Sequence, residues 1–265
     1  MKIIVPIKQV PETSNVKMDP ETGTMVRSGV EQIINPLDLY AIEEAIRLKD
    51  DKGGEIVTMT MGPPSAEKAL REAIAMGCDS GILLSDKNFA GADTWSTSYV
   101  LAQAIKQIGD FDVILCGERA TDGDTGQVGP GIASWLKIPF LTYVSGIDKV
   151  TEESMIAERN VENGYQFLEI QRPALFTVVK EINFPRLPTL SGKKKARDIE
   201  IPVWGPQDID AEPENLGLQG SPTRVVKISK PKVTREGEKL TPQTDQEVEE
   251  SVYKLIQYFE KLEII

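Results

Sequence analysis

The stretch FDVILCGERATDGDTGQVGPG, residues 111–131, determines the predicted fold, because it places an apolar strand directly before a glycine-rich turn and a helix. Residues 111–116 have the pattern of a short buried strand, and a helical pattern continues through residues 132–136. In open α/β sheets ligands bind at the carboxyl ends of the strands, where helix N-termini attract anions. The stretch therefore predicts an α/β fold and indicates a nucleotide-binding loop.

The composition of this loop supports a nucleotide, although it matches neither standard phosphate-binding fingerprint, G-x-G-x-x-G or G-x-x-x-x-G-K-[ST]. Its glycines allow backbone amides to approach a phosphate, and Thr125 and Gln127 add donors. Asp122 and Asp124 would repel a phosphate, so they suit ribose hydroxyls or loop structure better. Arg119 can face a flavin or a pyrophosphate, but pairing with one of these aspartates is favoured. A plain surface turn stays an alternative.

The same alternation of strand and helix runs through the first half of the chain. Asn35 can cap a helix, Pro36 suits its first turn, and Asp38 faces the positive end of its dipole. Strands that alternate with helices imply right-handed crossovers and a parallel sheet with helices on both faces. Strands are predicted at residues 3–7, 55–61, 81–85 and 111–116, with helices from Asp38 to Gly53, around 70–77, at 93–108 and through 132–136.

The second half of the chain has a different pattern. Apolar runs on both sides of Asn163-Gly164 predict a β-hairpin within residues 155–170, and residues 173–179 suit a return to the sheet. The last helix is predicted at residues 244–265, opened by a capping box. Its apolar positions follow a 3.5-residue repeat, which suits packing along another helix, with packing on its own domain as the alternative. These positions are Val248, Val252, Leu255, Phe259 and Leu262.

Composition excludes several kinds of chemistry. The chain has no histidine, which excludes Ser-His-Asp and Cys-His catalysis, and its two cysteines are too few for a four-cysteine metal site. A net charge of −11 argues against a nucleic-acid partner. No apolar run approaches the ~18 residues of a membrane span, and the start lacks a signal-peptide cleavage pattern. We therefore expect a cytoplasmic protein without a metal site that borrows its redox chemistry from a cofactor.

The chain resembles the β subunit of electron-transfer flavoproteins over essentially its whole length. The resemblance implies a Rossmann-like sheet of the adenine-nucleotide-hydrolase type, with a β-hairpin and a C-terminal extension that carries a long helix. It implies an α/β nucleotide-binding domain at residues 1–200, with a recognition loop at 183–197, and an extension at 201–265 whose helix clasps a partner. The motifs that carry it are VPIKQVP at 5–11, INP at 34–36, EEA at 43–45, MGP at 61–63, AIAMG at 73–77, DGDTGQ at 122–127 and PTL at 188–190.

The resemblance also implies the site residues. A nucleotide is held near the first strand and the glycine-rich loop, and the expected partners are an obligate α subunit with its own flavin and a flavin dehydrogenase. Asp93, Thr94 and Thr97 are candidates for contacts near an isoalloxazine ring, although a helix cap explains Asp93 equally well. The other expected nucleotide contacts are Pro6, Asn35, Pro36, Leu37, Asp38, Met61, Arg119, Ala120, Thr121, Asp122, Gly123, Asp124, Thr125, Gly126 and Gln127; the expected docking residues are Leu190, Lys193, Lys194 and Lys195.

Two subtypes of the family remain. The segments 16–24 and 27–30 and the short loop at 122–130 resemble electron-bifurcating members from anaerobic bacteria, although Leu37-Asp38-Leu39-Tyr40 departs from their pattern. In that subtype FAD in the β subunit takes hydride from NADH or returns it to NAD. One electron goes to the α-subunit FAD, which serves an acyl-CoA, enoyl-CoA or hydroxy-acid dehydrogenase, and the other goes to ferredoxin. The alternatives are a non-bifurcating β subunit with structural AMP and, more remotely, a universal-stress-like nucleotide-binding regulator.

Overall fold

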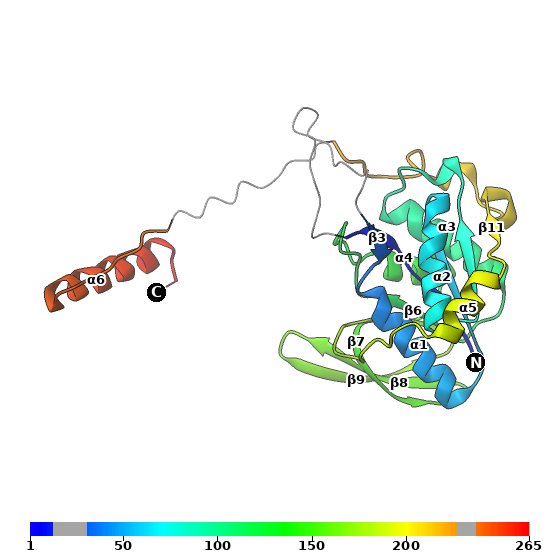
Figure 1. Ribbon diagram of the computed structural model, residues 1–265, viewed down its shortest axis with the longest axis horizontal. Coiled ribbons are helices and arrows are strands. Elements are labelled where there is room, and N and C mark those ends of the chain that lie inside the picture. The colour runs from blue at the N-terminus through cyan, green and yellow to red at the C-terminus, as the bar shows by residue number, and fades with distance from the viewer. Residues whose placement is uncertain (13–30, 227–236, 265) are drawn as a thin grey trace. The chain divides into compact units, whose positions relative to one another are not determined.

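The computed structural model describes residues 1–12, 31–226 and 237–264, and it divides into two compact units, Met1–Lys227 and Ile228–Ile265 (Figure 1). The first unit extends beyond the boundary at residue 200 that was expected from the sequence. The segments 16–24 and 27–30, which suggested the bifurcating subtype, lie outside the described residues.

Within the described residues, the first unit is built on a nine-stranded sheet with the order β11-β5-β4-β1-β6-β10-β7-β8-β9. The strands from β11 to β7 pair in parallel, and β8 and β9 add an antiparallel extension. The strands are β1 (Lys2–Pro6), β4 (Glu55–Met61), β5 (Ser80–Leu84), β6 (Val113–Gly117), β7 (Phe140–Val150), β8 (Ser154–Val161), β9 (Gly164–Gln171), β10 (Ala174–Val178) and β11 (Val203–Trp204), with a separate ribbon of β2 (Gln9–Pro11) and β3 (Gln32–Ile34).

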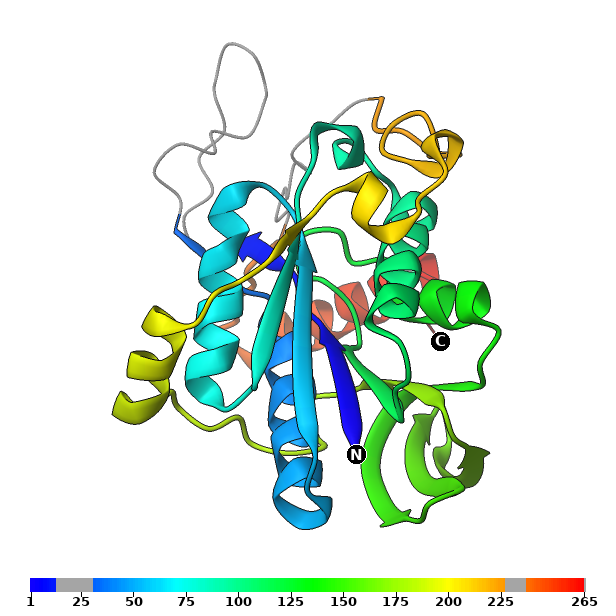
Figure 2. The same cartoon turned by 90° about the vertical axis from the view of Figure 1, so that its right-hand side faces the viewer.

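Helices cover both faces of this sheet, so the predicted α/β class is confirmed (Figure 2). The first two helices end at Gly53 and Gly77, as the sequence predicted. These two glycines have positive φ angles of 70° and 146°. The helices are α1 (Asp38–Lys52), α2 (Glu67–Met76), α3 (Thr94–Ile108), α4 (Val128–Leu136) and α5 (Leu190–Asp198), with single turns at η2 (Pro64–Ala66), η3 (Lys87–Phe89), η4 (Pro206–Ile209) and η5 (Pro213–Asn215).

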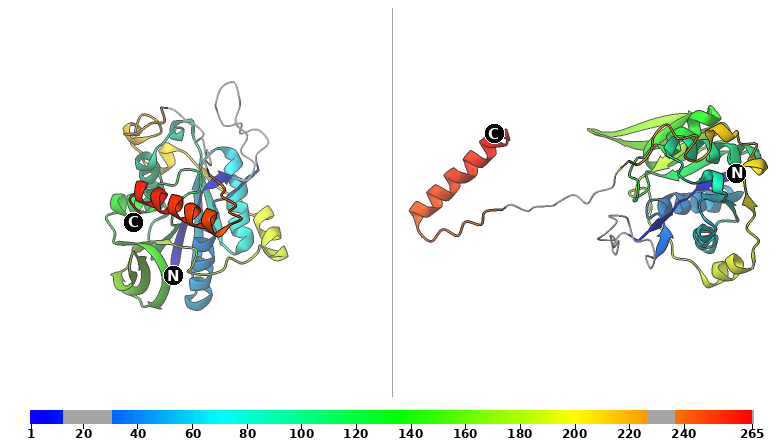
Figure 3. Two further views of the ribbon diagram at one scale, coloured as in Figure 1. Left: turned by 90° about the vertical axis from the view of Figure 1, so that its left-hand side faces the viewer. Right: turned by 90° about the horizontal axis from the view of Figure 1, so that it is seen from above.

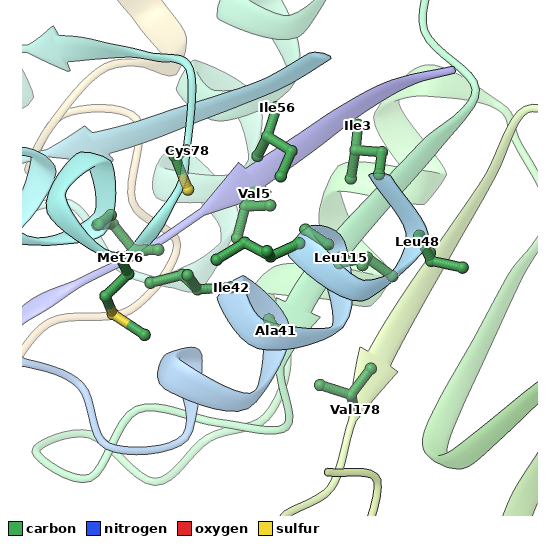
Figure 4. Packing of buried hydrophobic residues seen from close by; sticks show 14 of the residues in the cluster. Ile3, Val5, Ala41, Ile42, Leu48, Ile56, Met76, Cys78, Leu115 and Val178 are labelled. Atoms are coloured by element: carbon green, nitrogen blue, oxygen red, sulfur yellow. The ribbon is translucent and has the colours of Figure 1, made fainter. Parts of the chain in front are cut away.

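Successive residues of β1 belong to two separate cores, one on each face of the sheet. Ile3 and Val5 pack against α1 and α2, where Figure 4 shows them beside Ile42. Ile4 faces α3 and α4 on the opposite side. All four of these side chains are fully buried. This central strand is therefore apolar on both faces, which is the pattern expected for a strand inside a parallel sheet.

Three elements differ from the sequence-based prediction. The hairpin around Asn163-Gly164 is present as β8 and β9 (Figure 3). Strand β7 before it was not predicted, because register shifts break its pairing with β8 and its alternation of buried and exposed residues. Strand β11 was also not predicted from the sequence. Only the first part of the recognition loop at 183–197 is irregular, because Thr189 caps α5 by accepting a hydrogen bond from the backbone N–H of Gly192 at 2.9 Å.

The second unit contains α6 (Asp245–Lys261), which confirms the predicted terminal helix. Thr244 accepts from the N–H of Glu247 at 3.3 Å, while the Glu247 carboxylate accepts from the N–H of Gln243 at 2.7 Å. No residue of α6 is buried, and the apolar positions Val248, Val252 and Leu255 are about half exposed. Among the described residues, no helix has both the length and the apolarity needed to cross a membrane.

Two glycines let α4 lie unusually close to its neighbours. A Cβ atom on Gly129 would lie 2.7 Å from the Thr177 methyl group of β10. A Cβ atom on Gly131 would lie 2.6 Å from Ser98 Oγ and 2.7 Å from Ser98 Cβ on α3. Both distances are shorter than van der Waals contact, so these positions require glycine for packing. They fix the place of α4, whose N-terminus follows the glycine-rich loop.

We expect Gly131→Ala to lower the free energy of unfolding by about 1–3 kcal/mol, because the new methyl group must displace Ser98 or the helix. Urea unfolding followed by tryptophan fluorescence measures this change. Gly123→Ala is the matched control, since a Cβ atom there meets no atom within 4 Å, and it should change stability by less than about 0.5 kcal/mol. Equal stabilities for the two variants would contradict the close packing of α3 and α4.

Candidate functional site

The sheet changes direction between β1 and β6. From β1 the chain builds β4 and β5 on one side, and it then crosses to place β6 on the other side of β1. At such a topological switch point, the loops that follow the two strands diverge and leave a crevice at their carboxyl ends. The segments that reach this edge are Lys8 after β1, the 35–38 segment before α1, and the loop after β6 at residues 118–127.

The buried residue Asn35 joins these three segments through its backbone and its side chain. Its backbone N–H donates to the carbonyl oxygen of Lys8 at 2.8 Å. Its side-chain Nδ2 donates to the carbonyl oxygen of Arg119 at 2.9 Å, and its Oδ1 accepts from the N–H of Thr121 at 3.1 Å. The predicted capping role of Asn35 is therefore wrong, because the amide is used across the crevice; Leu37 occupies the N-cap position of α1 without a side-chain bond.

Asp38 is a buried carboxyl group at the base of the crevice. Its Oδ2 accepts from the backbone N–H of Lys8 at 2.7 Å, and only 6% of the residue is exposed. Desolvation by burial raises the pKa of Asp38 to about 7, although hydrogen bonds from Lys8 and Asn35 oppose the rise. Gly117, the last residue of β6, allows this approach, since a Cβ atom there would collide with the Asp38 carboxylate.

The charged side chains of the loop are paired with one another or with Lys8. Lys8 Nζ lies 2.7 Å from Asp122 Oδ1, and Arg119 Nε lies 2.8 Å from Asp124 Oδ1. Arg119 also contacts Glu118 at 3.2 Å. The pairing of Arg119 with Asp122 or Asp124 that the sequence favoured is therefore present, with Asp124 as the partner. Because each aspartate faces a cation, the loop presents less negative charge to an anionic ligand than its composition suggests.

The N-terminus of α4 is available to an anion. Its N-cap residue Gln127 makes no capping hydrogen bond through its side chain, and the first turn carries no acidic residue. Gly126 turns the chain into this helix with a φ of 62°, a conformation that L side chains rarely adopt. Thr121 and Thr125, which precede this helix in the loop, are exposed residues. Free N–H groups at a helix N-terminus together with hydroxyl donors suit a phosphate or pyrophosphate.

The three residues proposed for the isoalloxazine ring belong to the start of α3, where Asp93 has a structural role. Its Oδ1 accepts from the N–H groups of Trp95 and Ser96 at 3.0 and 3.1 Å. Its Oδ2 accepts from the N–H and the hydroxyl of Thr223 at 2.9 and 2.7 Å. Asp93 is therefore the N-cap residue of α3, as one of its two interpretations predicted. Thr94 and Thr97 are half-buried residues of the first turn of this helix.

The remaining predicted contacts lie at the same edge or along the loop. Pro6 ends β1 and is buried, Met61 ends β4 and is half-buried, and Pro36 is exposed. Ala120 and Gly123 belong to the loop itself. Two site residues were missed from the sequence, Lys8 and Gly117. Lys8 lies two residues after the end of β1 and Gly117 ends β6, and this position at the switch point is the signal that could have identified them.

The expected docking residues lie on α5. Leu190 is its first residue and is 88% exposed, and Lys193 and Lys194 are exposed on the same helix. Lys195 instead lies 3.6 Å from Asp79 and donates to the carbonyl oxygen of Cys78 at 3.1 Å. Among the described residues, no group of three or more histidine, cysteine, aspartate or glutamate side chains could hold a metal ion.

A switch point beside a glycine-rich loop and an uncapped helix N-terminus is the arrangement typical of α/β nucleotide-binding proteins. A family model described as electron transfer flavoprotein domain matches residues 22–208. The chain is 47% identical to the caffeyl-CoA reductase-Etf complex subunit CarD of Acetobacterium woodii, covering 94% of this chain and 95% of that one. It is 45% identical to an electron transfer flavoprotein subunit beta from Thermoanaerobacterium thermosaccharolyticum, with 96% and 98% covered.

A third relative is the acryloyl-CoA reductase electron transfer subunit gamma of Anaerotignum propionicum, 41% identical over 97% of this chain and 98% of that one. The chain therefore belongs to the electron transfer flavoprotein family, to its beta subunits. This membership confirms the resemblance found in the sequence.

Asp38 should make the stability of the protein depend on pH. Its pKa rises from 3.8 to about 7 on folding, so the folded protein binds more protons than the unfolded protein between those values. Stability should therefore fall as the pH rises through this window and level off above it. Asp38→Asn keeps an oxygen for the N–H of Lys8 but cannot titrate, so a slope of up to about 1.4 kcal/mol per pH unit should disappear.

Urea unfolding of the nucleotide-free chain at several values between pH ~4 and ~7.5 measures this slope. Asp124→Asn is the control, because that carboxylate lies in the loop after β6 and its side chain is 72% exposed. An Asp38→Asn variant with the wild-type slope would contradict the assignment.

Proposed function

We propose that this beta subunit binds FAD at the switch-point crevice and serves an electron-bifurcating complex, with NADH as the hydride donor or NAD as the acceptor. The observation that carries the proposal is the bridge by Asn35, which brings the 118–127 loop to the N-terminal side of α1. When bound, the flavin would accept the hydride of NADH and release its two electrons singly, one to the α-subunit FAD and one to ferredoxin.

The chain's own residues would bind and orient this nucleotide. The N-terminus of α4 would hold the pyrophosphate, with Thr125 and Gln127 as nearby donors. Asp122 and Asp124, already paired with cations, suit ribose hydroxyls better than phosphate oxygens. The buried Asp38 and Asn35 would keep the crevice at a fixed width. The family alternative is AMP at the same position, since one phosphate satisfies the same helix end.

Nucleotide analysis of the purified αβ heterodimer tests the proposal. We expect two FAD per heterodimer, with one lost selectively in Gly126→Val, because a β-branched side chain at a φ of 62° costs about 1–3 kcal/mol and crowds the loop. Gly146→Ala on β7, where a Cβ atom would lie at an ordinary 3.8 Å from Glu158 Cβ, is the control and should keep both. One FAD and one AMP per heterodimer would establish the non-bifurcating alternative. Unchanged nucleotide content in Gly126→Val would show that the loop is only a turn.

We also propose that Leu190 anchors a partner flavin dehydrogenase of the acyl-CoA, enoyl-CoA or hydroxy-acid type. Two relatives are named for caffeyl-CoA and acryloyl-CoA reductase systems, which supports an acyl-CoA-type partner. The exposure of Leu190, beside the exposed Lys193 and Lys194, suits an apolar anchor next to charges that steer association. The ion pair of Lys195 with Asp79 leaves Lys195 less free for such a role.

Leu190→Ala should weaken binding of that dehydrogenase about 10- to 100-fold, because a buried leucine anchor contributes roughly 1.5–3 kcal/mol. Dehydrogenase binding and NADH-driven dye reduction are measured on one sample, and only binding should fall. A parallel loss of both would show a damaged fold, and unchanged binding would show that Leu190 is not the anchor.

The exposed seam of α6 is proposed to clasp the α subunit. Val248, Val252 and Leu255 lie on the 3.5-residue repeat and are about half exposed, which suits burial against another helix. Cys78 and Cys116 are both free and buried, which suits the reducing cytoplasm that we propose as the location.

A further inference from the structure

The segment before α5 displays three large apolar side chains to solvent. Phe184 is 95% exposed, Leu187 is 85% exposed and Leu190 is 88% exposed. They are three residues apart, with prolines 185 and 188 between them, and residues 183–189 form neither helix nor strand. A spacing of three residues is the repeat of a polyproline II helix, which needs no hydrogen bonds of its own. Such a segment depends on its surroundings for a fixed shape.

Helix α1 supplies a buried anchor for this segment. Arg186 donates from its backbone N–H and from Nε to Glu43 Oε2, at 3.0 and 2.9 Å. Its Nη2 donates to Glu43 Oε1 at 3.0 Å, which makes the pair bidentate. Glu43 is only 5% exposed, and these hydrogen bonds raise the pKa of Arg186 above its usual value. Asp50 lies two turns further along the same face of α1, and its Oδ2 lies 3.2 Å from Arg186 Nη2 at a largely exposed position.

A second carboxylate on α1 holds the start of the segment. Asn183 Nδ2 donates to Glu44 Oε2 and to the carbonyl oxygen of Tyr40, both at 3.0 Å. Arg47 pairs with the same Glu44 oxygen at 2.9 Å and donates to the carbonyl oxygen of Ile182 at 3.3 Å. Glu44 is 4% exposed, so this junction is as well shielded from water as the Glu43 pair.

The other end of the segment is fixed on α2. The N–H of Thr189 donates to the carbonyl oxygen of Ala75 at 3.3 Å, and Gly192 approaches that same carbonyl too closely for any Cβ atom. The segment is thus tied at both ends and in the middle, while its apolar side chains point away from the domain. Figure 2 shows it running from the side of α1 to α5. A docking segment that is ordered before binding loses less conformational entropy on association.

We propose that Glu43 and Glu44 are positioning residues that hold residues 182–190 so that Phe184, Leu187 and Leu190 form one apolar docking edge. This inference rests on the proposed docking function of Leu190. The occupant is an apolar groove of the partner flavin dehydrogenase with carboxylates on its rim. The exposed cations Lys193 and Lys194 flank the edge on an otherwise acidic chain, so they favour an acidic rim.

Trypsin cleavage of the full chain in its αβ heterodimer reports whether the segment is held. The bond between Arg186 and Leu187 is a trypsin site whose arginine is bound to Glu43. We expect Glu43→Gln to speed cleavage at this bond at least about tenfold, because cleavage follows the population of the opened segment. Asp50→Asn removes a carboxylate from the same arginine at an exposed position, and it should change the rate less than about twofold. Equal rates in the two variants would overturn the inference.

Docking is measured with a flavin-dependent acyl-CoA dehydrogenase that co-purifies with the heterodimer. Glu43→Gln should raise the apparent KM for the flavoprotein about tenfold and leave kcat within about twofold, since only the order of the docking segment changes. A raised KM in Leu190→Ala together with a wild-type KM in Glu43→Gln would overturn this inference alone. An unchanged KM in Leu190→Ala would overturn the proposed docking function, and this inference with it.

If Glu43→Gln does not fold, Arg186→Gln breaks the same pair from its more exposed side, where the arginine side chain is 37% exposed. Hydrogen exchange of residues 182–190 in that variant replaces the trypsin readout. Faster exchange confined to this segment supports the inference, and wild-type protection there overturns it.

Discussion

The candidate site depends on one buried amide group. The backbone N–H of Asn35 bonds to Lys8 and its side chain bonds to the backbone of Arg119 and Thr121, so this single residue joins the exit of β1, the entry of α1 and the exit of β6. Burial makes this constraint strong, because an amide that lost these partners inside the protein would cost about 1–3 kcal/mol for each unpaired group. The relative positions of these three segments at the switch point are therefore set before any ligand arrives.

Helix α1 connects this crevice to the docking segment. Its first residue, Asp38, lies against Gly117 at the base of the crevice. Its middle residues Glu43 and Glu44 hold the chain that displays Leu190. Helix α1 packs on the sheet through Ala41 and Ile42 (Figure 4). The residues of the proposed nucleotide site and the segment of the proposed dehydrogenase site are therefore positioned by the same helix.

Periodicity and turn residues were sufficient to predict most of the fold. Strand β4 has the predicted bounds, and α1 and α2 end at the predicted glycines, because these features depend on local sequence. Contacts between distant segments could not be predicted in this way. The sequence allowed Asn35 to cap a helix, and only the spatial meeting of residues 35 and 119 assigns its amide elsewhere. The bidentate pair of Arg186 with Glu43 was not predicted for the same reason, because residues 43 and 186 are distant in the sequence.

The number of glycines in and around the loop is larger than a phosphate-binding site would need, because several of them are required for packing. Gly117 makes room for the Asp38 carboxylate, and Gly129 and Gly131 make room for Thr177 and Ser98. Their absent side chains therefore serve the packing of the protein. Gly126 is different, because its positive φ turns the chain into α4, whose N-terminus bears no side-chain cap. Within the glycine-rich stretch, the part that suits the proposed ligand is therefore the turn at Gly126 and the first amides of α4. Gly129 lets this helix lie close to β10, and Gly131 lets it lie close to α3.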